Sequence, residues 1–283
     1  MFGSFGFVGS EFCRQYPDEI IRIPKHEVTP DTNEVLYLIS TISNYNIFDS
    51  PTLDIETNLL HFMDVLDASH KKFGNKFTFN LVSSWFVYGR PEFDLVENFP
   101  LHEEAPCNPT GFYSITARCR EQLLISYCET FGIKYRILRL ANVLGAKDNK
   151  VSKKKNALQH LLDKLVLNED IELYNGGEFY RDYIDVRDCV RAIRLVMEKG
   201  THPIYNISNG TSHLFKDLIN LGVLYSGSKG NIWDKPDVPE FHKIVQSKDV
   251  FLHNGKLKDL GYEPEFSIEQ TLHDIIDSYK GKQ

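Results

Sequence analysis

The 283-residue chain, with 42% hydrophobic and 25% charged residues, has the composition of a globular protein with a sizeable core. Its formal net charge of −7 disfavours a nucleic acid or an anionic membrane surface as a partner. No apolar run reaches the ~18 residues that a membrane span needs, and five cysteines without metal-ligand spacing indicate reduced thiols, so we expect a cytoplasmic protein without a bound metal.

The apolar runs of the chain alternate with helix-length amphipathic stretches, which is typical of a parallel sheet covered by helices on both faces. The expected strands span 19–23, 35–42, 77–83, 135–140 and 204–207. The expected helices span 53–72, 113–131, 158–167, a stretch that follows 180–186 and ends near 199, and 267–279. Segment 222–254 shows little periodicity. The pattern predicts a Rossmann-type, doubly wound α/β fold whose smaller C-terminal lobe covers the carboxyl edge of the sheet, where ligands bind in such folds.

A glycine-rich loop, GSFGFVG at residues 3–9, opens the chain. A loop of this kind at the start of a helix directs backbone N–H groups and the positive helix end toward a pyrophosphate. Gly3 would allow the tight turn, Gly6 the close approach of the ligand and Gly9 the packing of helix on strand. Only two residues precede the loop, and residues 25–34 leave no room for the customary helix–strand pair. Either the sequence begins late within the fold, or a trimmed sheet closes its centre in another way.

Two further segments follow in a fixed order. SSWFVYG at 83–89 ends the third expected strand, and PTGFYSITA at 109–117, with Glu121 after it, opens a helix. In order and spacing these segments resemble the extended short-chain dehydrogenase/reductases, the NAD(P)-dependent family of nucleotide-sugar epimerases and dehydratases. The resemblance implies a catalytic Ser or Thr, a Tyr, and a Lys four residues after the Tyr. Here Ser84 and Tyr113 fill the first two positions, and Ala117 occupies the lysine position.

The alanine leaves the activity open. A phenol has a pKa near 10, so Tyr113 needs help to exchange a proton at neutral pH. In the family the help comes from the lysine one turn later on the same helix face, which also holds the ribose hydroxyls of the nicotinamide. Losing a charge-assisted hydrogen bond costs roughly 1.5–3 kcal/mol. Arg118 is turned about 100° away on the helix, and Arg120 is nearer the right face but two turns on.

Three interpretations of Ala117 stay open. The enzyme uses a different cation or a slow step; or a lysine was deliberately replaced to trap a complex; or the protein has lost catalysis and kept ligand binding.

The two residues after Ser84 narrow the reaction that the resemblance implies. Dehydratases of the family carry acidic residues there, whereas this chain has Trp85 and Phe86, whose rings cannot serve as acid or base. This favours a C4 epimerase or a 4-keto reductase, with hydride exchanged at the nicotinamide, Tyr113 as acid/base and Ser84 assisting. The alternative is a protein that binds the cofactor and the sugar nucleotide without converting them.

The resemblance also implies NAD or NADP as cofactor and a nucleoside-diphosphate sugar as substrate. Cofactor-binding residues are expected at Gly3, Gly6, Phe7, Val8, Gly9, Lys25, Ser40, Thr41 and Tyr113. Substrate-binding residues are expected at Ser84, Trp85, Phe86, Asn142 and Arg181, the last two within segments that match the family patterns LRxxNVxG and RDYxxVxD. The stretch 20–25 lacks the carboxylate that would hold the adenosine ribose of NAD. Arg22 or Lys25 would instead meet the 2′-phosphate of NADP, although as surface charges they need no ligand.

The chain divides into two expected parts. Residues 1–145 should form the NAD(P)-binding Rossmann domain, to which the 187–207 region returns, and residues 146–283 should form mainly the substrate-binding lobe. The broad apolar faces of helices 53–72 and 113–131 either pack on the sheet of their own chain or form a helix bundle with a second copy. The resemblance favours a homodimer through these two helices.

Overall fold

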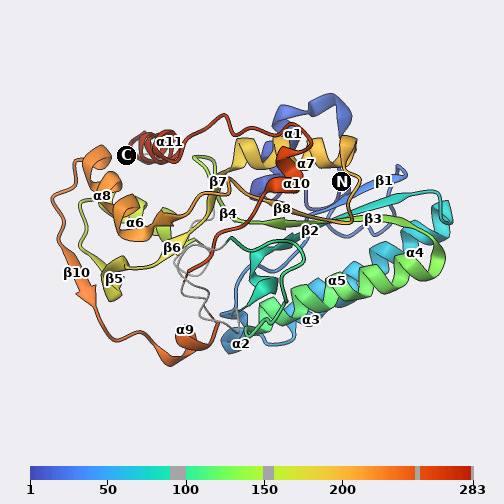
Figure 1. Cartoon of the computed structure of the whole chain (residues 1–283), viewed down its shortest axis with the longest axis horizontal. Helices are drawn as coiled ribbons and strands as arrows, with labels where there is room; N and C mark the ends of the chain where they lie inside the picture. The colour runs from blue at the N-terminus through green and yellow to red at the C-terminus, as the bar shows by residue number, and fades with distance from the viewer. Residues whose placement is uncertain (90–99, 149–155, 246–248, 282–283) are drawn as a thin grey trace.

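A parallel four-stranded sheet forms the centre of the molecule (Figure 1). The computed structural model describes residues 1–89, 100–148, 156–245 and 249–281. The sheet has the order β1-β2-β3-β8, with strands β1 (Glu34–Tyr37), β2 (Thr78–Ser84), β3 (Lys134–Leu140) and β8 (Ile204–Ile207). Helices cover both faces, so most residues of these strands are buried, although β3 also carries three charged residues. All the strands point the same way, so their carboxyl ends share one edge.

The first two residues take the place of a strand beside β1. The backbone of Phe2 donates to Leu36 (2.9 Å) and accepts from Leu38 (3.1 Å), which makes a parallel bridge to Tyr37. On its other side, Met1 bonds with Ile21 and Ile23 through two backbone contacts. Met1 and Phe2 thus connect β1 to the extended residues 21–23.

The strand that we expected at 19–23 is wrong. Pro17–Glu19 forms a 3-10 helix, and the residues after it are extended without a ladder of their own. A ladder needs a neighbouring strand of several residues, and among the described residues Met1 is the one that bonds to this segment, since Phe2 bonds to β1. The next expected strand, 35–42, is shorter than predicted: the strand observed there, β1, ends at Tyr37.

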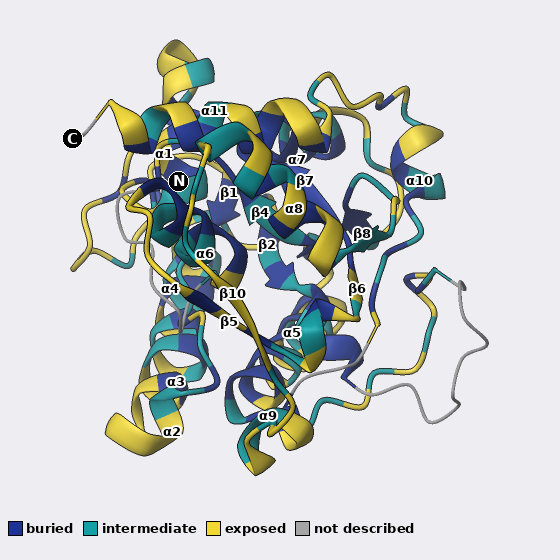
Figure 2. Cartoon of the chain, turned by 90° about the vertical axis from the view of Figure 1, so that its left-hand side faces the viewer, coloured by how far each residue is buried: buried dark blue, intermediate teal, exposed yellow. Residues whose placement is uncertain are grey.

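Two layers of helices cover the sheet. One face carries α1 (Phe7–Gln15) and α7 (Val186–Lys199), which pack against each other above the sheet in Figure 1. The other face carries α5 (Phe112–Phe131) and a long helix over 53–73. Figure 2 shows the sheet strands largely buried between these layers, whose outer faces are exposed. The doubly wound α/β fold predicted from the sequence is confirmed.

The long helix contains an irregular turn. It consists of α3 (Leu53–Ile55), a π-helical turn at Glu56–Leu60 and α4 (His61–Phe73). A π turn inserts one extra residue into a helix and changes the direction of the side chains within it. Asn58, inside this turn, is fully buried.

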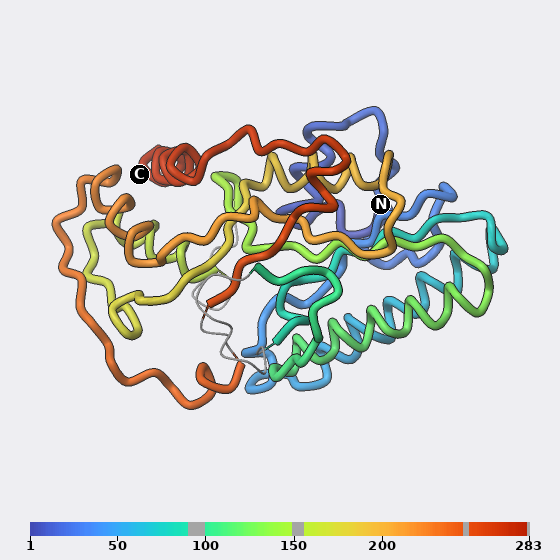
Figure 3. The backbone as a smooth tube through the Cα atoms, in the orientation of Figure 1, coloured from blue at the N-terminus to red at the C-terminus, as the bar shows by residue number. Residues whose placement is uncertain are grey.

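The C-terminal lobe has its own apolar core, built around Leu162, Leu173, Ile219 and Leu272. Its elements are α6 (Ala157–Val166), β5 (Ile171–Tyr174), α8 (Phe215–Ser226), β10 (Ile232–Lys235) and α11 (Ile268–Lys280). The segment 222–254, which showed little periodicity, thus contains β10 and α9 (Glu240–Val245). Figure 3 shows the chain leaving β10 and crossing to α9, which meets α2 (Asn46–Asp49). Within the described parts, no helix combines the length and apolarity needed to cross a membrane.

Short strand pairs connect the lobe to the sheet. They are β4 (Asn142–Leu144) with β7 (Tyr183–Asp185), and β6 (Tyr180–Arg181) with β9 (His213–Leu214). The chain near the C-terminus adds α10 (Gly255–Lys258), which lies against β8.

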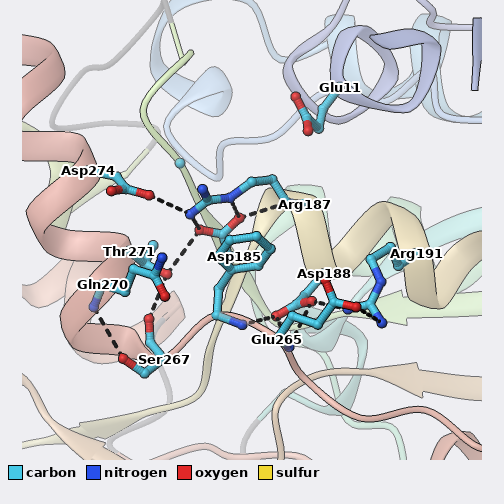
Figure 4. Close-up of polar contacts among 12 residues, drawn as sticks. Glu11, Asp185, Arg187, Asp188, Arg191, Glu265, Ser267, Gln270, Thr271 and Asp274 are labelled. Atoms are coloured by element: carbon cyan, nitrogen blue, oxygen red, sulfur yellow. Dashed lines mark hydrogen bonds and ion pairs between the residues drawn. The ribbon is translucent and has the colours of Figure 1, made fainter. Parts of the chain in front are cut away.

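A polar network fixes α11 to the start of α7 (Figure 4). Asp185 accepts from the backbone N–H of Arg187 at 2.8 Å and from the hydroxyl of Thr271 at 2.9 Å. The Arg187 guanidinium bridges Asp185 and Asp274 at 2.7 Å each. One turn later, Asp188 accepts from the backbone N–H groups of residues 265 and 266. These buried carboxylates hold the lobe at a fixed position relative to the sheet.

Candidate functional site

A large cleft, with a volume of about 2050 Å³, lies at the carboxyl edge of the sheet. Its walls come from the ends of β1, β2 and β3 on one side and from the C-terminal lobe on the other. A pocket for a single drug-sized ligand rarely exceeds ~1000 Å³, so this cleft has room for two ligands end to end. Of the predicted site residues, the following line it: Gly3, Gly6, Phe7, Val8, Gly9, Ser40, Ser84, Trp85, Phe86, Tyr113, Asn142 and Arg181.

The glycine loop forms one end of the cleft. Gly3 has φ +80°, a left-handed conformation that disfavours other residues. A Cβ added to Gly9 would lie 2.2 Å from the carbonyl oxygen of Gly3, so α1 can start this close to the loop only with glycine there. The N-terminus of α1 has no capping side chain and no acidic residue in its first turn. An open, positive helix end in a cleft wall suits a phosphate.

Ser84 and Tyr113 reach the cleft from different elements. Ser84 ends β2, and its hydroxyl accepts from the backbone N–H of Phe86 at 3.3 Å. Tyr113 lies in the first turn of α5. A close contact at Gly89 holds the two segments together, because its φ of +63° and missing Cβ let it bridge to Asn108. The motif residues after Ser84 therefore fix the position of the loop that leads into α5.

The Tyr113 phenol lies in a mixed environment. Burial raises its pKa, while the Arg120 charge and the nearby hydroxyls of Ser84 and Ser40 oppose that rise. Those three groups favour the ionised phenol, and they come from α5, β2 and the loop after β1. Ala117, one turn after Tyr113, is fully buried in the apolar core and does not line the cleft.

The two arginines near Ala117 differ sharply in position. Arg118 lies at the surface of α5 and pairs with Glu121 at 2.8 Å. Arg120 is 1% exposed and lines the cleft. Its guanidinium donates to the backbone carbonyls of Ile39 (2.9 Å) and Val82 (3.2 Å). Sequence reasoning placed Arg120 two turns from Tyr113 without seeing that its long side chain reaches back to the cleft wall.

Buried amides anchor the loop after β1 to α5. Asn58 accepts from the hydroxyl of Ser40 and the backbone N–H of Thr41, and it donates to the hydroxyls of Thr41 and Thr116. Thr41 is thereby turned away from the cleft, whereas Ser40 lines it. A second amide, Asn44, lies so close to α5 that a Cβ on Gly111 would sit 2.1 Å from its oxygen.

Aromatic side chains form the floor between the two halves of the cleft. The rings of Trp85 and Phe86 stack at 4.0 Å between centroids, and Phe86 meets the Tyr113 ring edge-on at 5.9 Å. The Arg181 guanidinium lies over Trp85 at 5.7 Å and over Phe179 at 4.8 Å. The structure thus places the predicted substrate-side residues Trp85, Phe86 and Arg181 next to one another.

Asn142 and Asp182 connect the two parts of the cleft. The Asn142 side chain donates to the carbonyl of Asp182 at 2.9 Å, which locks the β4–β7 pair beside the cleft. Asp182 is buried; burial raises the pKa of its carboxyl to about 7, although the backbone N–H groups of Leu252 and Gly210 oppose the shift.

A wall of the cleft that sequence reasoning missed comes from α9. Phe241 packs on Tyr45 and on Phe48 of α2, with ring centroids 5.2 and 4.8 Å apart. The Tyr45 hydroxyl also contacts the His242 ring, and both residues line the cleft. The segment is polar and aperiodic in sequence, so only the aromatic residues within it gave any signal.

Two of the predicted cofactor-binding residues do not line the cleft: Thr41, described above, and Lys25. Arg22, its alternative, lies over the ring of Phe5 in the glycine loop at 5.8 Å, and Phe5 is 71% exposed. Among the described residues, no group of three or more His, Cys, Asp or Glu side chains could bind a metal ion.

Comparisons with known proteins identify the family of the chain. A family model described as "NAD dependent epimerase/dehydratase family" matches residues 17–208. The chain is 26% identical to a putative UDP-glucose 4-epimerase of Methanocaldococcus jannaschii, over 88% of this chain and 78% of that protein. It is 25% identical to a GDP-6-deoxy-D-mannose reductase of Pseudomonas aeruginosa, over 83% of this chain and 76% of that protein.

Solved structures show the same fold. A Thermotoga maritima UDP-glucose 4-epimerase with UDP-glucose superposes with a TM-score of 0.85 at 23% identity, covering 99% of this chain and 98% of that one. The Pseudomonas aeruginosa protein RMD, complexed with NADPH, gives a TM-score of 0.83 at 22% identity, with 100% and 99% covered.

Proposed function

Because the chain belongs to the NAD-dependent epimerase/dehydratase family, within the extended short-chain dehydrogenase/reductases, we propose that it is a nucleotide-sugar C4 epimerase or 4-keto reductase. The observation that carries the proposal is the meeting of Ser84 and Tyr113 at the wall of a cleft that also contains the glycine loop. A phenol and a hydroxyl at one point suit proton exchange with a sugar hydroxyl or carbonyl.

The residues of the glycine loop fit NAD or NADP. Gly9 packs closely on Gly3, so the uncapped end of α1 lies next to the loop. There a pyrophosphate would accept hydrogen bonds from backbone N–H groups. When bound, the nicotinamide would take up a hydride and return it. Neither Arg22 nor Lys25 lines the cleft, but Arg22 lies over the ring of Phe5 in the glycine loop and is therefore our candidate for the 2′-phosphate of NADP. We therefore favour NADP over NAD.

Tyr113 would move the proton at its phenolic oxygen. It accepts the proton of the C4 hydroxyl when the sugar is oxidised and returns it when the keto sugar is reduced. Ser84, at the end of β2, would hold the same sugar oxygen by a hydrogen bond. Both hydroxyls lie on rigid elements, so the sugar and not the protein would turn between the two steps of an epimerase.

The sugar nucleotide would lie toward the C-terminal lobe. Arg181 presents a planar donor fork that suits a diphosphate, and Asn142 donates to the carbonyl of Asp182, the residue after Arg181. The stacked rings of Trp85 and Phe86 would form the sugar pocket. The two positions directly after Ser84 hold Trp85 and Phe86 and not acidic residues, so elimination of water by a dehydratase is disfavoured.

A catalytically silent binding protein is the second candidate, favoured by Ala117 at the lysine position. Turnover of UDP- and GDP-sugars and their 4-keto forms, with NADH and NADPH, separates the two. We expect Tyr113→Phe and Ser84→Ala to lower kcat by at least about tenfold while leaving cofactor binding intact. Binding of both ligands with no turnover in any form, including Ala117→Lys, would favour the silent protein.

The wider organisation is also proposed. Residues 1–145, with 187–207 in the same sheet and helix layer, would hold the cofactor, and 146–283 mainly the sugar nucleotide. The outer face of the 53–73 helix and α5 carries exposed apolar side chains, at Ile55, Leu60, Ile115 and Phe131. We propose that a second copy covers this face in a homodimer. Light scattering of Leu60→Glu should then show a monomer, whereas an unchanged mass would refute this interface.

A further inference from the structure

Arg120 carries a charge that the fold buries without a carboxylate partner. Its side chain is 1% exposed, and among the described residues it forms no ion pair within 4.0 Å. Two backbone carbonyls hold the terminal nitrogens, while the Nε atom has no hydrogen-bond partner in the part of the chain that the structure describes. A buried, unpaired charge costs several kcal/mol of solvation, so its retention at the wall of the cleft needs a reason.

The position of Arg120 relates it directly to Tyr113. Residues seven apart lie on the same face of a helix, two turns from each other. The intervening residue on that face, Ala117, is small and fully buried, and so leaves space for a long side chain to reach back. The carbonyls that hold the guanidinium belong to residue 39, which directly precedes Ser40, and to residue 82, which lies two positions before Ser84 on the same strand; Ser40 and Ser84 are the two residues whose hydroxyls contact Tyr113.

We propose that Arg120 supplies the positive charge that lets Tyr113 release and recover a proton, in place of a cation at residue 117. This inference rests on the proposed role of Tyr113 as the proton carrier. Arg120 acts through the tyrosine and is a positioning and charge-supplying residue. Its attraction to the ionised phenol opposes the effect of burial on the pKa of Tyr113. A guanidinium suits this task because it stays protonated even where burial lowers its pKa.

Several other groups act on the two partners. The polar groups that face Tyr113 besides Arg120 are the hydroxyls of Ser84 and Ser40 and the carboxylate of Asp54 on α3. Those that face Arg120 are the phenols of Tyr37 and Tyr113 and the carboxylate of Glu121. Two charged groups of the described chain face the Tyr113 phenol. The carboxylate of Asp54 opposes its ionisation, and Arg120 is the cation that favours it.

The test measures the ionisation of residue 113 itself. Difluorotyrosine placed at that position is more acidic than tyrosine, and its ¹⁹F resonance follows the titration in the full chain without cofactor or substrate. Arg120→Gln keeps N–H donors for the two carbonyls but removes the charge, and it should raise the midpoint by about 1 pH unit or more, the usual effect of losing a close opposite charge. Arg120→Lys should raise it less.

Matched variants separate charge from structure. Arg118→Gln, which removes a guanidinium from the surface of the same helix, should leave the midpoint unchanged. Ala117→Lys added to Arg120→Met should bring the midpoint back toward that of the unmodified chain. An unchanged midpoint in both Arg120→Gln and Arg120→Met would overturn the proposal. If the midpoint shifts while Tyr113→Phe turns over normally, the charge effect stands and the proposed catalytic role fails.

Discussion

Asn58 is expected to hold the cofactor side of the cleft in place. It lies in the π turn of the 53–73 helix and is completely buried. Its amide makes four hydrogen bonds: from the hydroxyl of Ser40 at 3.1 Å, from the N–H of Thr41 at 3.0 Å, to the hydroxyl of Thr41 at 2.7 Å and to that of Thr116 at 3.0 Å. One side chain thus joins three segments, and Asn58→Ala removes all these contacts.

The magnitude follows from the number of bonds. A buried hydrogen bond contributes about 0.5–1.5 kcal/mol net, and a buried donor left without an acceptor costs about 1–3 kcal/mol. The N–H of Thr41 is such a donor. A water molecule could replace part of the amide and restore some of these hydrogen bonds, so we take less than the full sum of the contributions. We expect Asn58→Ala to lower the free energy of unfolding by about 2–4 kcal/mol. Because Ser40 lines the cleft, cofactor affinity should also fall by about tenfold or more.

Urea denaturation measures the first effect, and a direct cofactor titration measures the second. Asn220→Ala is the matched control, since this asparagine is exposed on α8 and should change the free energy of unfolding by less than about 0.5 kcal/mol. A loss below about 1 kcal/mol in Asn58→Ala, with unaltered cofactor affinity, would refute the reasoning.

Three further changes test the fold around the site. Gly9→Ala places a Cβ 2.2 Å from a loop carbonyl, so it should cost about 1–3 kcal/mol and weaken cofactor binding in a titration. Glu121→Gln leaves the buried Arg139 without its 2.8 Å ion pair and should lower the free energy of unfolding, measured by urea denaturation, by about 3–5 kcal/mol. In the control Asp67→Asn, which breaks an exposed ion pair, the loss should be under about 1 kcal/mol. Asp182 has a pKa raised to about 7, so between about pH 4 and 7 the unfolded chain loses this proton first and stability falls as pH rises. Asp182→Asn should therefore melt higher than the unmodified chain at pH 8, with a smaller difference at pH 5; a difference independent of pH would contradict this assignment.

The parts of the fold that the sequence predicts well are those governed by burial. Strands β2 and β3 were predicted to within one residue, because each has a centre rich in apolar and β-branched residues. Helix α5 was equally clear from its motif and its length. The short segment at Met1 and Phe2 was not predictable in its role, since two residues carry no periodicity and their partners lie far along the chain.

The candidate site divides in the same way. Ser84 and Tyr113 could be assigned because they lie in contiguous motifs that resemble those of the family, and the structure places both at the cleft. The π turn at Asn58 has no local signature, and α9 reaches the cleft only through tertiary contacts of aromatic rings. Lys25 shows the converse failure: a charge at a plausible position in sequence lies away from the cleft.

Two arginines of the core, Arg120 and Arg139, are both 1% exposed but have different partners. Arg139 is neutralised by Glu121 through two hydrogen bonds at 2.8 and 3.1 Å, as expected for a charge that serves the core. Arg120 is buried to the same extent but held by carbonyl groups, whose partial charges position it without cancelling it. Its field therefore remains directed at the phenols of Tyr37 and Tyr113, and only the second of these lines the cleft. Among the described residues, Arg139 has a carboxylate partner and Arg120 has none within 4.0 Å, and this difference is the observation behind the proposed role of Arg120 at the site.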